Sequence, residues 1–124
     1  MLAMLLSVAL QAGSPVAETG WAEVGRFDDN ETIYLQTDNL ERQGTVSRAW
    51  SWSRFDTPQE GGVTSTFFRN DYDCAARTYS FVAYRKVNAS GEIVDEGTIA
   101  PAERTTRPIN PGSNADRELR LVCR

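Results

Sequence analysis

The sequence predicts an α+β domain that is mainly β, with about six antiparallel strands and a C-terminal helix tethered to the sheet by a disulfide between Cys74 and Cys123. Three observations support this fold. Segments 45–55 and 77–87 alternate their side chains with the period of two that is typical of strands. Turn-forming residues separate shorter segments that are rich in aromatic and β-branched residues. Helical spacing of apolar residues is found near the C-terminus.

The first half of the sheet begins with a predicted hairpin. Segments 21–27 and 32–36 have strand composition, and Asp28-Asp29-Asn30 between them favours a turn. Segment 38–44 is predicted as a turn or a single helical loop, and the alternating strand 45–55 follows it. One face of this strand presents Val46, Arg48, Trp50 and Trp52, and the other presents Ser47, Ala49, Ser51 and Ser53.

The second half of the sheet is predicted as three strands, which cover residues 63–68, 77–87 and 92–98. The break at 58–62 precedes the first of them, and the polar residues 69–71 predict a turn after it. The bend 88–91 makes the last two strands a second hairpin. The alternation in the middle strand predicts one face made of Tyr79, Phe81, Ala83 and Val87.

The C-terminal region lacks the strand pattern and is predicted as a loop followed by a helix. Segment 101–111 contains three prolines and no periodicity, which predicts an extended surface loop. Ser113 followed by Asp116 has the form of a helix-capping pair. After it, the apolar positions of one helical face are Ala115, Leu119, Val122 and Cys123.

The N-terminal segment 1–17 is an apolar run followed by small, turn-prone residues, and this order is typical of a signal peptide. A buried N-terminal strand or helix is the alternative interpretation. The segment is shorter than the roughly 20 apolar residues that span a bilayer, so no membrane-spanning segment is expected. Residues 18–124 are then expected to form a single domain of a periplasmic protein, or of one that is secreted to the cell surface.

The two cysteines allow one intramolecular pairing. In an oxidising compartment Cys74 is expected to join Cys123 and to stabilise the fold by roughly 3–5 kcal/mol. Two unpaired buried thiols are the alternative.

Composition excludes several kinds of chemistry. The sequence contains no histidine, so catalytic triads that depend on histidine are impossible, and two cysteines alone cannot form a four-ligand zinc site. The net charge is −4 with interspersed signs, which argues against nucleic-acid binding. The sequence therefore predicts a protein that is not an enzyme and that uses no cofactor or metal. Its oligomeric state is not predicted.

Two sets of residues are candidates for binding a protein partner. Trp50 and Trp52 share one strand face and could form an aromatic platform, although large aromatic residues on a sheet face also serve as core. The second set is a group of basic side chains near the C-terminus, for which a solvated surface is the alternative. It consists of Arg104, Arg107, Arg117 and Arg120.

Several residues occur in an order that resembles the bacterial surface-adhesin protein E family, over about Gly20 to Arg124. The most specific parts are the Tyr72-Asp73-Cys74 segment with Arg77, and Pro111-Gly112-Ser113 leading to the final cysteine. The other matching positions are Trp21, Tyr34, Gly44, Trp50, Gly91, Ile109 and Asn110.

The resemblance implies a six-stranded antiparallel sheet with a C-terminal helix that a disulfide tethers to it. It also implies an exported binding module of the bacterial envelope, similar to a surface protein that binds host glycoproteins such as vitronectin and laminin. The sequence leaves one alternative function, a small periplasmic inhibitor of an enzyme such as a cell-wall hydrolase, with segment 101–111 as its inhibitory loop.

Overall fold

The structure is a computed structural model that describes residues 20–124. The predicted signal peptide, segment 1–17, lies outside the described residues and stays a prediction. The same holds for the domain boundary placed after it.

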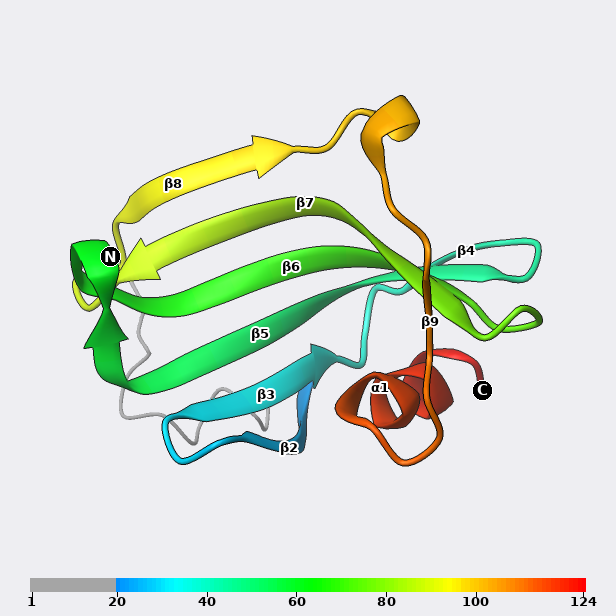
Figure 1. Ribbon diagram of the computed structural model, residues 1–124, viewed down its shortest axis with the longest axis horizontal. Helices are drawn as coiled ribbons and strands as arrows, with labels where there is room; N and C mark the ends of the chain where they lie inside the picture. The colour runs from blue at the N-terminus through cyan, green and yellow to red at the C-terminus, as the bar shows by residue number, and fades with distance from the viewer. Residues whose placement is uncertain (1–19) are drawn as a thin grey trace.

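The described residues form one antiparallel sheet and one α-helix (Figure 1). Neighbouring strands follow the order β2-β3-β5-β6-β7-β8, with β4 beside β5 and β9 beside β7. The strands are β2 (Trp21–Phe27), β3 (Glu31–Gln36), β4 (Glu41–Gln43), β5 (Val46–Gln59), β6 (Val63–Asp73), β7 (Thr78–Asn88), β8 (Ile93–Thr98) and β9 (Arg107–Pro108). The predicted fold, a mainly β domain with a six-stranded path and a C-terminal helix, is confirmed.

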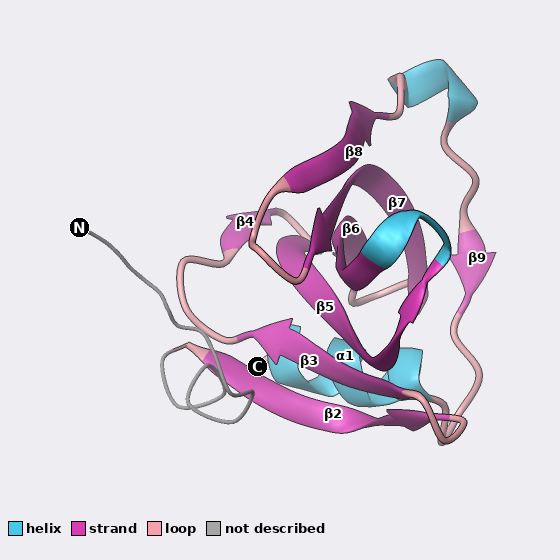
Figure 2. Ribbon diagram, turned by 90° about the vertical axis from the view of Figure 1, so that its left-hand side faces the viewer, coloured by secondary structure: helices cyan, strands magenta, loops and turns pink. Residues whose placement is uncertain are grey.

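The sheet is strongly curled, and helix α1 (Asn114–Val122) lies against β2, β3 and β5 (Figure 2). We call the side that α1 covers the inner face and the opposite side the outer face. The inner face of β5 presents Ser47, Ala49, Ser51 and Ser53, and its outer face presents Arg48, Trp50, Trp52 and Arg54. The predicted alternation is confirmed, and the helix packs against the face of small side chains.

The prediction of a turn at 69–71 is wrong, because β6 continues through these residues to Asp73. Arg69, Asn70 and Asp71 have hydrogen-bonded partners in both β5 and β7, so the neighbouring strands override their polar, turn-like composition. The chain turns instead at 74–77. There Asp73 Oδ1 accepts hydrogen bonds from the amides of Ala75 and Ala76, and these bonds lower the pKa of Asp73.

Other boundaries also differ from the prediction. Segment 38–44 contains the short strand β4, and β5 runs on to Gln59. Segment 101–111 is not wholly a loop, since it contains a 3-10 turn, η3 (Pro101–Glu103), and β9. Both short strands form only by pairing with a longer neighbour, and no local pattern indicates that pairing.

A β-bulge in β7 corrects the predicted face of that strand. Phe81 lies opposite Asn70 and Ala83 lies opposite Arg69, so Val82 is the extra residue between two successive pairs. The bulge places Phe81 on the inner face and Ala83 on the outer face. The alternation that the sequence predicts therefore does not extend through the whole strand.

The core lies between α1 and the inner face. Ser113 caps the helix as predicted, since its side chain accepts a hydrogen bond from the Asp116 amide. The buried apolar side chains of this core are Leu35, Ala49, Tyr72, Ile109, Leu119 and Val122.

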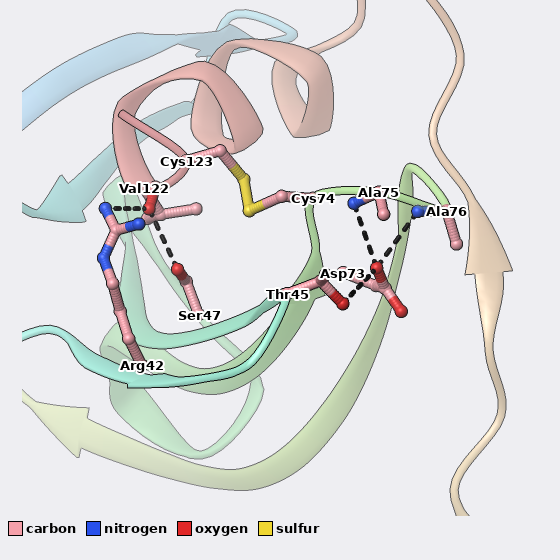
Figure 3. Close-up of a disulfide and its surroundings, with 9 residues drawn as sticks. All are labelled: Arg42, Thr45, Ser47, Asp73, Cys74, Ala75, Ala76, Val122 and Cys123. Atoms are coloured by element: carbon pink, nitrogen blue, oxygen red, sulfur yellow. Dashed lines mark hydrogen bonds between the residues drawn. A yellow bond between two sulfur atoms is a disulfide. The ribbon is translucent and has the colours of Figure 1, made fainter.

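The C-terminal end of α1 is tied to the sheet by the disulfide between Cys74 and Cys123, so the predicted pairing is confirmed (Figure 3). Cys123 follows the last helical residue and forms the C-cap. Arg42 and Ser47 donate hydrogen bonds of 2.7 and 3.0 Å to the Val122 carbonyl. That carbonyl is one of those a helix end leaves without an intrahelical partner, and the Arg42 cation also suits the negative end of the helix dipole.

The N-terminal end of α1 is held by Asp116, whose side chain is only 1% exposed. Arg77 and Arg120 each donate to this carboxylate at 2.7 Å, and the Gly112 amide donates at 2.9 Å. The Gly112 hydrogen bond, followed by the one from Arg77, lowers the pKa of Asp116 to about 2. Since Arg77 belongs to the β6–β7 turn, this network fixes the start of the helix to the same turn as the disulfide.

A third polar contact lies under the middle of the helix. The hydroxyls of Tyr72 and Ser51 donate to the two oxygens of the buried Glu118 carboxylate. Asn70 Nδ2 donates to the Tyr72 hydroxyl at 2.9 Å, whereas Asn70 Oδ1 has no partner within the described residues. Burial raises the pKa of Glu118 and, together with the Glu118 charge, raises that of Tyr72.

Replacing both cysteines, Cys74→Ser with Cys123→Ser, should lower the free energy of unfolding by about 4 kcal/mol. The bond joins residues 49 apart, and the chain-entropy model gives about this value for such a loop. Urea denaturation measures the loss. Amide exchange should show that α1 loses protection while β5, β6 and β7 keep theirs. An unchanged denaturation midpoint in the double variant would contradict the structural role of the bond.

Asp116→Asn should destabilise the protein at pH 7, by roughly 5 °C or more in Tm, because it removes the charge from a buried hydrogen-bonded pair. The pKa of Asp116 is lowered in the folded state, so its contribution is present above its ordinary pKa of 3.8 and is lost as the pH falls towards about 2. The Tm values of the two proteins should therefore converge across this range. A constant difference from pH 7 to pH 2 would contradict the assignment.

Glu118→Gln should have the opposite effect, which makes it a matched comparison on the same helix. The pKa of Glu118 is raised in the folded state, so the wild type is favoured below its ordinary pKa of 4.5 and loses stability as the pH rises above it. Glutamine keeps an acceptor for Tyr72 and adds a donor for Ser51. We expect the variant to have a higher urea midpoint than the wild type at pH 7 and an equal one near pH 4. A lower midpoint at pH 7 would show that the buried charge is favourable.

Candidate binding surface on the outer face

A row of aromatic side chains crosses the outer face. Tyr34, Trp52 and Phe67 lie opposite one another in β3, β5 and β6, and their rings stack with centroid distances of 4.5 Å and 5.8 Å. Trp21 packs edge-on against Trp52 at 5.6 Å. The Trp52 indole N–H donates to the Ser65 hydroxyl at 2.9 Å, so the polar atom of this ring is satisfied. We call Trp21, Tyr34, Trp52 and Phe67 the aromatic row.

Trp50 lies on the same face of β5 as Trp52 of the aromatic row, and two arginines approach its ring. The guanidinium carbons of Arg69 and Arg85 lie 5.3 Å and 5.4 Å from the Trp50 ring centroid, within cation–π distance. Arg69 pairs with Glu41, and Arg85 pairs with Glu96 at 3.3 Å. We call Trp50, Arg69 and Arg85 the Trp50 platform. Its cations are held in position and their charges are balanced locally.

Two neighbouring arginines of the outer face also contact other side chains. Arg48 donates two hydrogen bonds, of 2.6 and 3.0 Å, to the Asp71 carboxylate, and this contact raises the pKa of Arg48. The guanidinium carbon of Arg54 lies 5.5 Å from the Tyr34 ring centroid. Because most of these cations have carboxylate partners, the outer face suits a protein surface better than a polyanion such as nucleic acid.

The two tryptophans predicted to form a platform differ in environment. Trp50 is half-buried at the surface, whereas Trp52 is 6% exposed within the aromatic row. Trp52 therefore belongs to the packed interior of the aromatic row, whereas Trp50 is partly exposed to solvent. Sequence reasoning missed Arg69 and Arg85. No sequence signal points to them, since they meet Trp50 through the register of three strands.

The four arginines predicted as a second binding set do not converge. Arg120 pairs with Asp116, Arg117 donates to the Asn114 side chain, and Arg104 donates to the Ile99 carbonyl. Arg107 lies over the Phe81 ring, 6.0 Å from its centroid. Each has a separate local contact, and a shared role in partner binding stays a prediction.

Residues 20–124 contain neither a metal-ion cluster nor a membrane-spanning helix. This part of the chain contains no group of three His, Cys, Asp or Glu side chains placed to hold a metal ion. None of its helices is both long and apolar enough to cross a membrane.

Comparison with known proteins gives one match. The family model described as surface-adhesin protein E matches residues 21–124, which is nearly the whole described chain. No curated protein and no solved structure matches the chain.

Proposed function

We propose that this chain, which belongs to the surface-adhesin protein E family, is an exported, non-enzymatic binding module that holds a protein partner on the outer face of its sheet. The observation that carries the proposal is the Trp50 platform. It brings two guanidinium groups within cation–π distance of one indole, on the same sheet face as a row of packed aromatic rings.

The composition of this surface supports a protein partner. Tryptophan, tyrosine and arginine are the side chains most often found at the energetic centres of protein interfaces. Arg69 and Arg85 are already oriented by Glu41 and Glu96, so little conformational entropy is lost when a partner binds. The indole and guanidinium groups of the platform have no nucleophile or general base at neutral pH, which suits recognition rather than catalysis.

The partner and the compartment belong to the same proposal. Family membership supports a host matrix or plasma glycoprotein, such as laminin or vitronectin, as the bound protein. Export through segment 1–17 would bring the domain to the periplasm or the cell surface, where the disulfide between Cys74 and Cys123 is stable.

Trp50→Ala should weaken binding to immobilised laminin or vitronectin about tenfold or more, which is the usual effect of truncating a central interface tryptophan. Surface plasmon resonance measures the change, and urea denaturation verifies that the variant is folded. Arg85→Ala should also weaken binding, since it removes one of the two cations of the Trp50 platform.

Phe27→Ala is the matched control, because Phe27 is an aromatic side chain that is 60% exposed and lies at the end of β2 away from the platform. Its binding should equal that of the wild type. Equal losses in the Phe27 and Trp50 variants, or no loss in either, would refute the outer face as the binding surface. Absence of binding by the wild type would refute the proposed partner class.

The inhibitor function is supported by a different observation. Segment 99–108 projects as an exposed connection that is pinned at both ends, by the hydrogen bond from Arg104 to the Ile99 carbonyl and by the pairing of β9 with β7 (Figure 1). A rigid projecting loop is what an enzyme inhibitor needs. Inhibition of a cell-wall hydrolase that is abolished by changes in η3, and not by Trp50→Ala, would favour this second function.

A further inference from the structure

The two ends of the sheet differ in what covers them. Helix α1, β9 and the disulfide lie at one end, and the turn between β5 and β6 lies at the other, which we call the open end (Figure 1). Within residues 20–124, three large hydrophobic side chains are exposed: Phe27 by 60%, Ile93 by 50% and Val94 by 45%. Strand register places all three at the open end, where Phe27 faces Glu31 and Ile93 faces Val87. Ile93 and Val94 are adjacent in β8 and mark an interaction surface there, whereas Phe27 lies in β2 at the opposite edge of the sheet.

A hollow of about 650 Å³ lies at the open end, between residues of β3 and β8. It lies on the inner face, where Ser53 and Thr66 continue the rows that α1 covers at the other end. Its apolar lining comes from Phe55, Val63, Phe68 and Val94. The volume falls within the range of about 300–1,000 Å³ that is usual for binding pockets.

The charges around the hollow are unbalanced. Three carboxylates, Glu31, Glu60 and Asp95, line it together with one cation, Lys86. None of these four groups belongs to an ion pair in the described part of the chain, whereas Arg69 and Arg85 on the outer face each have a carboxylate partner. The hollow therefore suits a ligand that is apolar and positively charged.

Strand β8 adds a backbone component beside the hollow. It is the last strand on this side of the sheet and pairs only with β7 among the described strands, so its outer edge presents unpaired backbone groups. Asp95 and Glu96 occupy the middle of this edge. Like charges of this kind oppose pairing between two copies of the same strand, but they attract a strand that carries lysine or arginine.

From these observations we propose that the open end docks an extended segment of a partner protein whose hollow-facing positions, every second residue of the strand, carry both apolar and basic side chains. The segment lies along the outer edge of β8, and on its hollow-facing side the apolar side chains enter the hollow while the cations face Glu31, Glu60 and Asp95. A second copy of this chain is a poor occupant, because it would bring two sets of unpaired carboxylates together. The site is separate from the Trp50 platform, so an experiment can refute either proposal without refuting the other.

A labelled synthetic peptide of Val-Ser-Lys-Ser repeats is the probe, because serine at every second position leaves valine and lysine on the same face of the strand. We expect saturable binding in fluorescence anisotropy, and chemical-shift changes in the protein confined to β8 and the lining of the hollow. Glu60→Lys should weaken binding about three- to tenfold, since it replaces one attraction by a repulsion. Glu103→Lys is the matched control: it makes the same charge change in the other exposed 3-10 turn, outside the hollow, and should leave the affinity unchanged.

Three further controls separate the parts of the proposal. A lysine–serine peptide should bind more weakly, because it lacks apolar side chains, and N-methylation of alternate peptide bonds should abolish strand addition. Trp50→Ala should have no effect on peptide binding, whatever it does to a glycoprotein partner. The proposal is overturned if the lysine–serine peptide binds equally well, if Glu60→Lys and Glu103→Lys behave alike, or if the shifts fall elsewhere. Chemical-shift changes at β8 that depend on protein concentration, and not on peptide concentration, would show that a second copy of the chain occupies this surface. That result would also overturn the proposal.

Discussion

Attachment of α1 to the inner face is the contact on which the rest of the structure depends. A helix of nine residues is too short to be stable alone in water, so its stability comes from the sheet. The disulfide between Cys74 and Cys123 holds one end, and Asp116 holds the other through Arg77. Both attachments reach the single turn that joins β6 to β7. The buried core therefore lies next to a turn that holds both ends of the helix.

The length of the helix also explains why the other end of the sheet stays open. Nine helical residues span about 14 Å, whereas the fourteen residues of β5 span roughly 46 Å, so one helix cannot cover the inner face. The uncovered part presents the hollow, with Phe55 and Val63 in its lining. The contacts that hold the helix and the apolar hollow thus lie at opposite ends of one sheet. A ligand at the open end need not disturb the helix.

No helix of residues 20–124 covers the outer face, and the side chains of this face pack against one another. Trp52 is buried among aromatic neighbours, and its indole N–H is satisfied by Ser65. Trp50 follows on the same strand face and lies within cation–π distance of Arg69 and Arg85. The same packing that replaces a second core layer therefore leaves one tryptophan at the surface, and a rigid tryptophan there favours recognition of a protein.

By itself the sequence determined the features that depend on a local pattern of residues or on the number of cysteines. The alternation of β5, the helix cap at Ser113 and the only possible cysteine pair could all be predicted, because each depends on nearby residues or on a single combination. Only the tertiary structure decided that β6 continues through residues 69–71, that Val82 forms a bulge, and that two arginines meet Trp50. These features depend on the register between strands distant in sequence, and the composition of one strand does not determine which residues of its neighbours lie beside it.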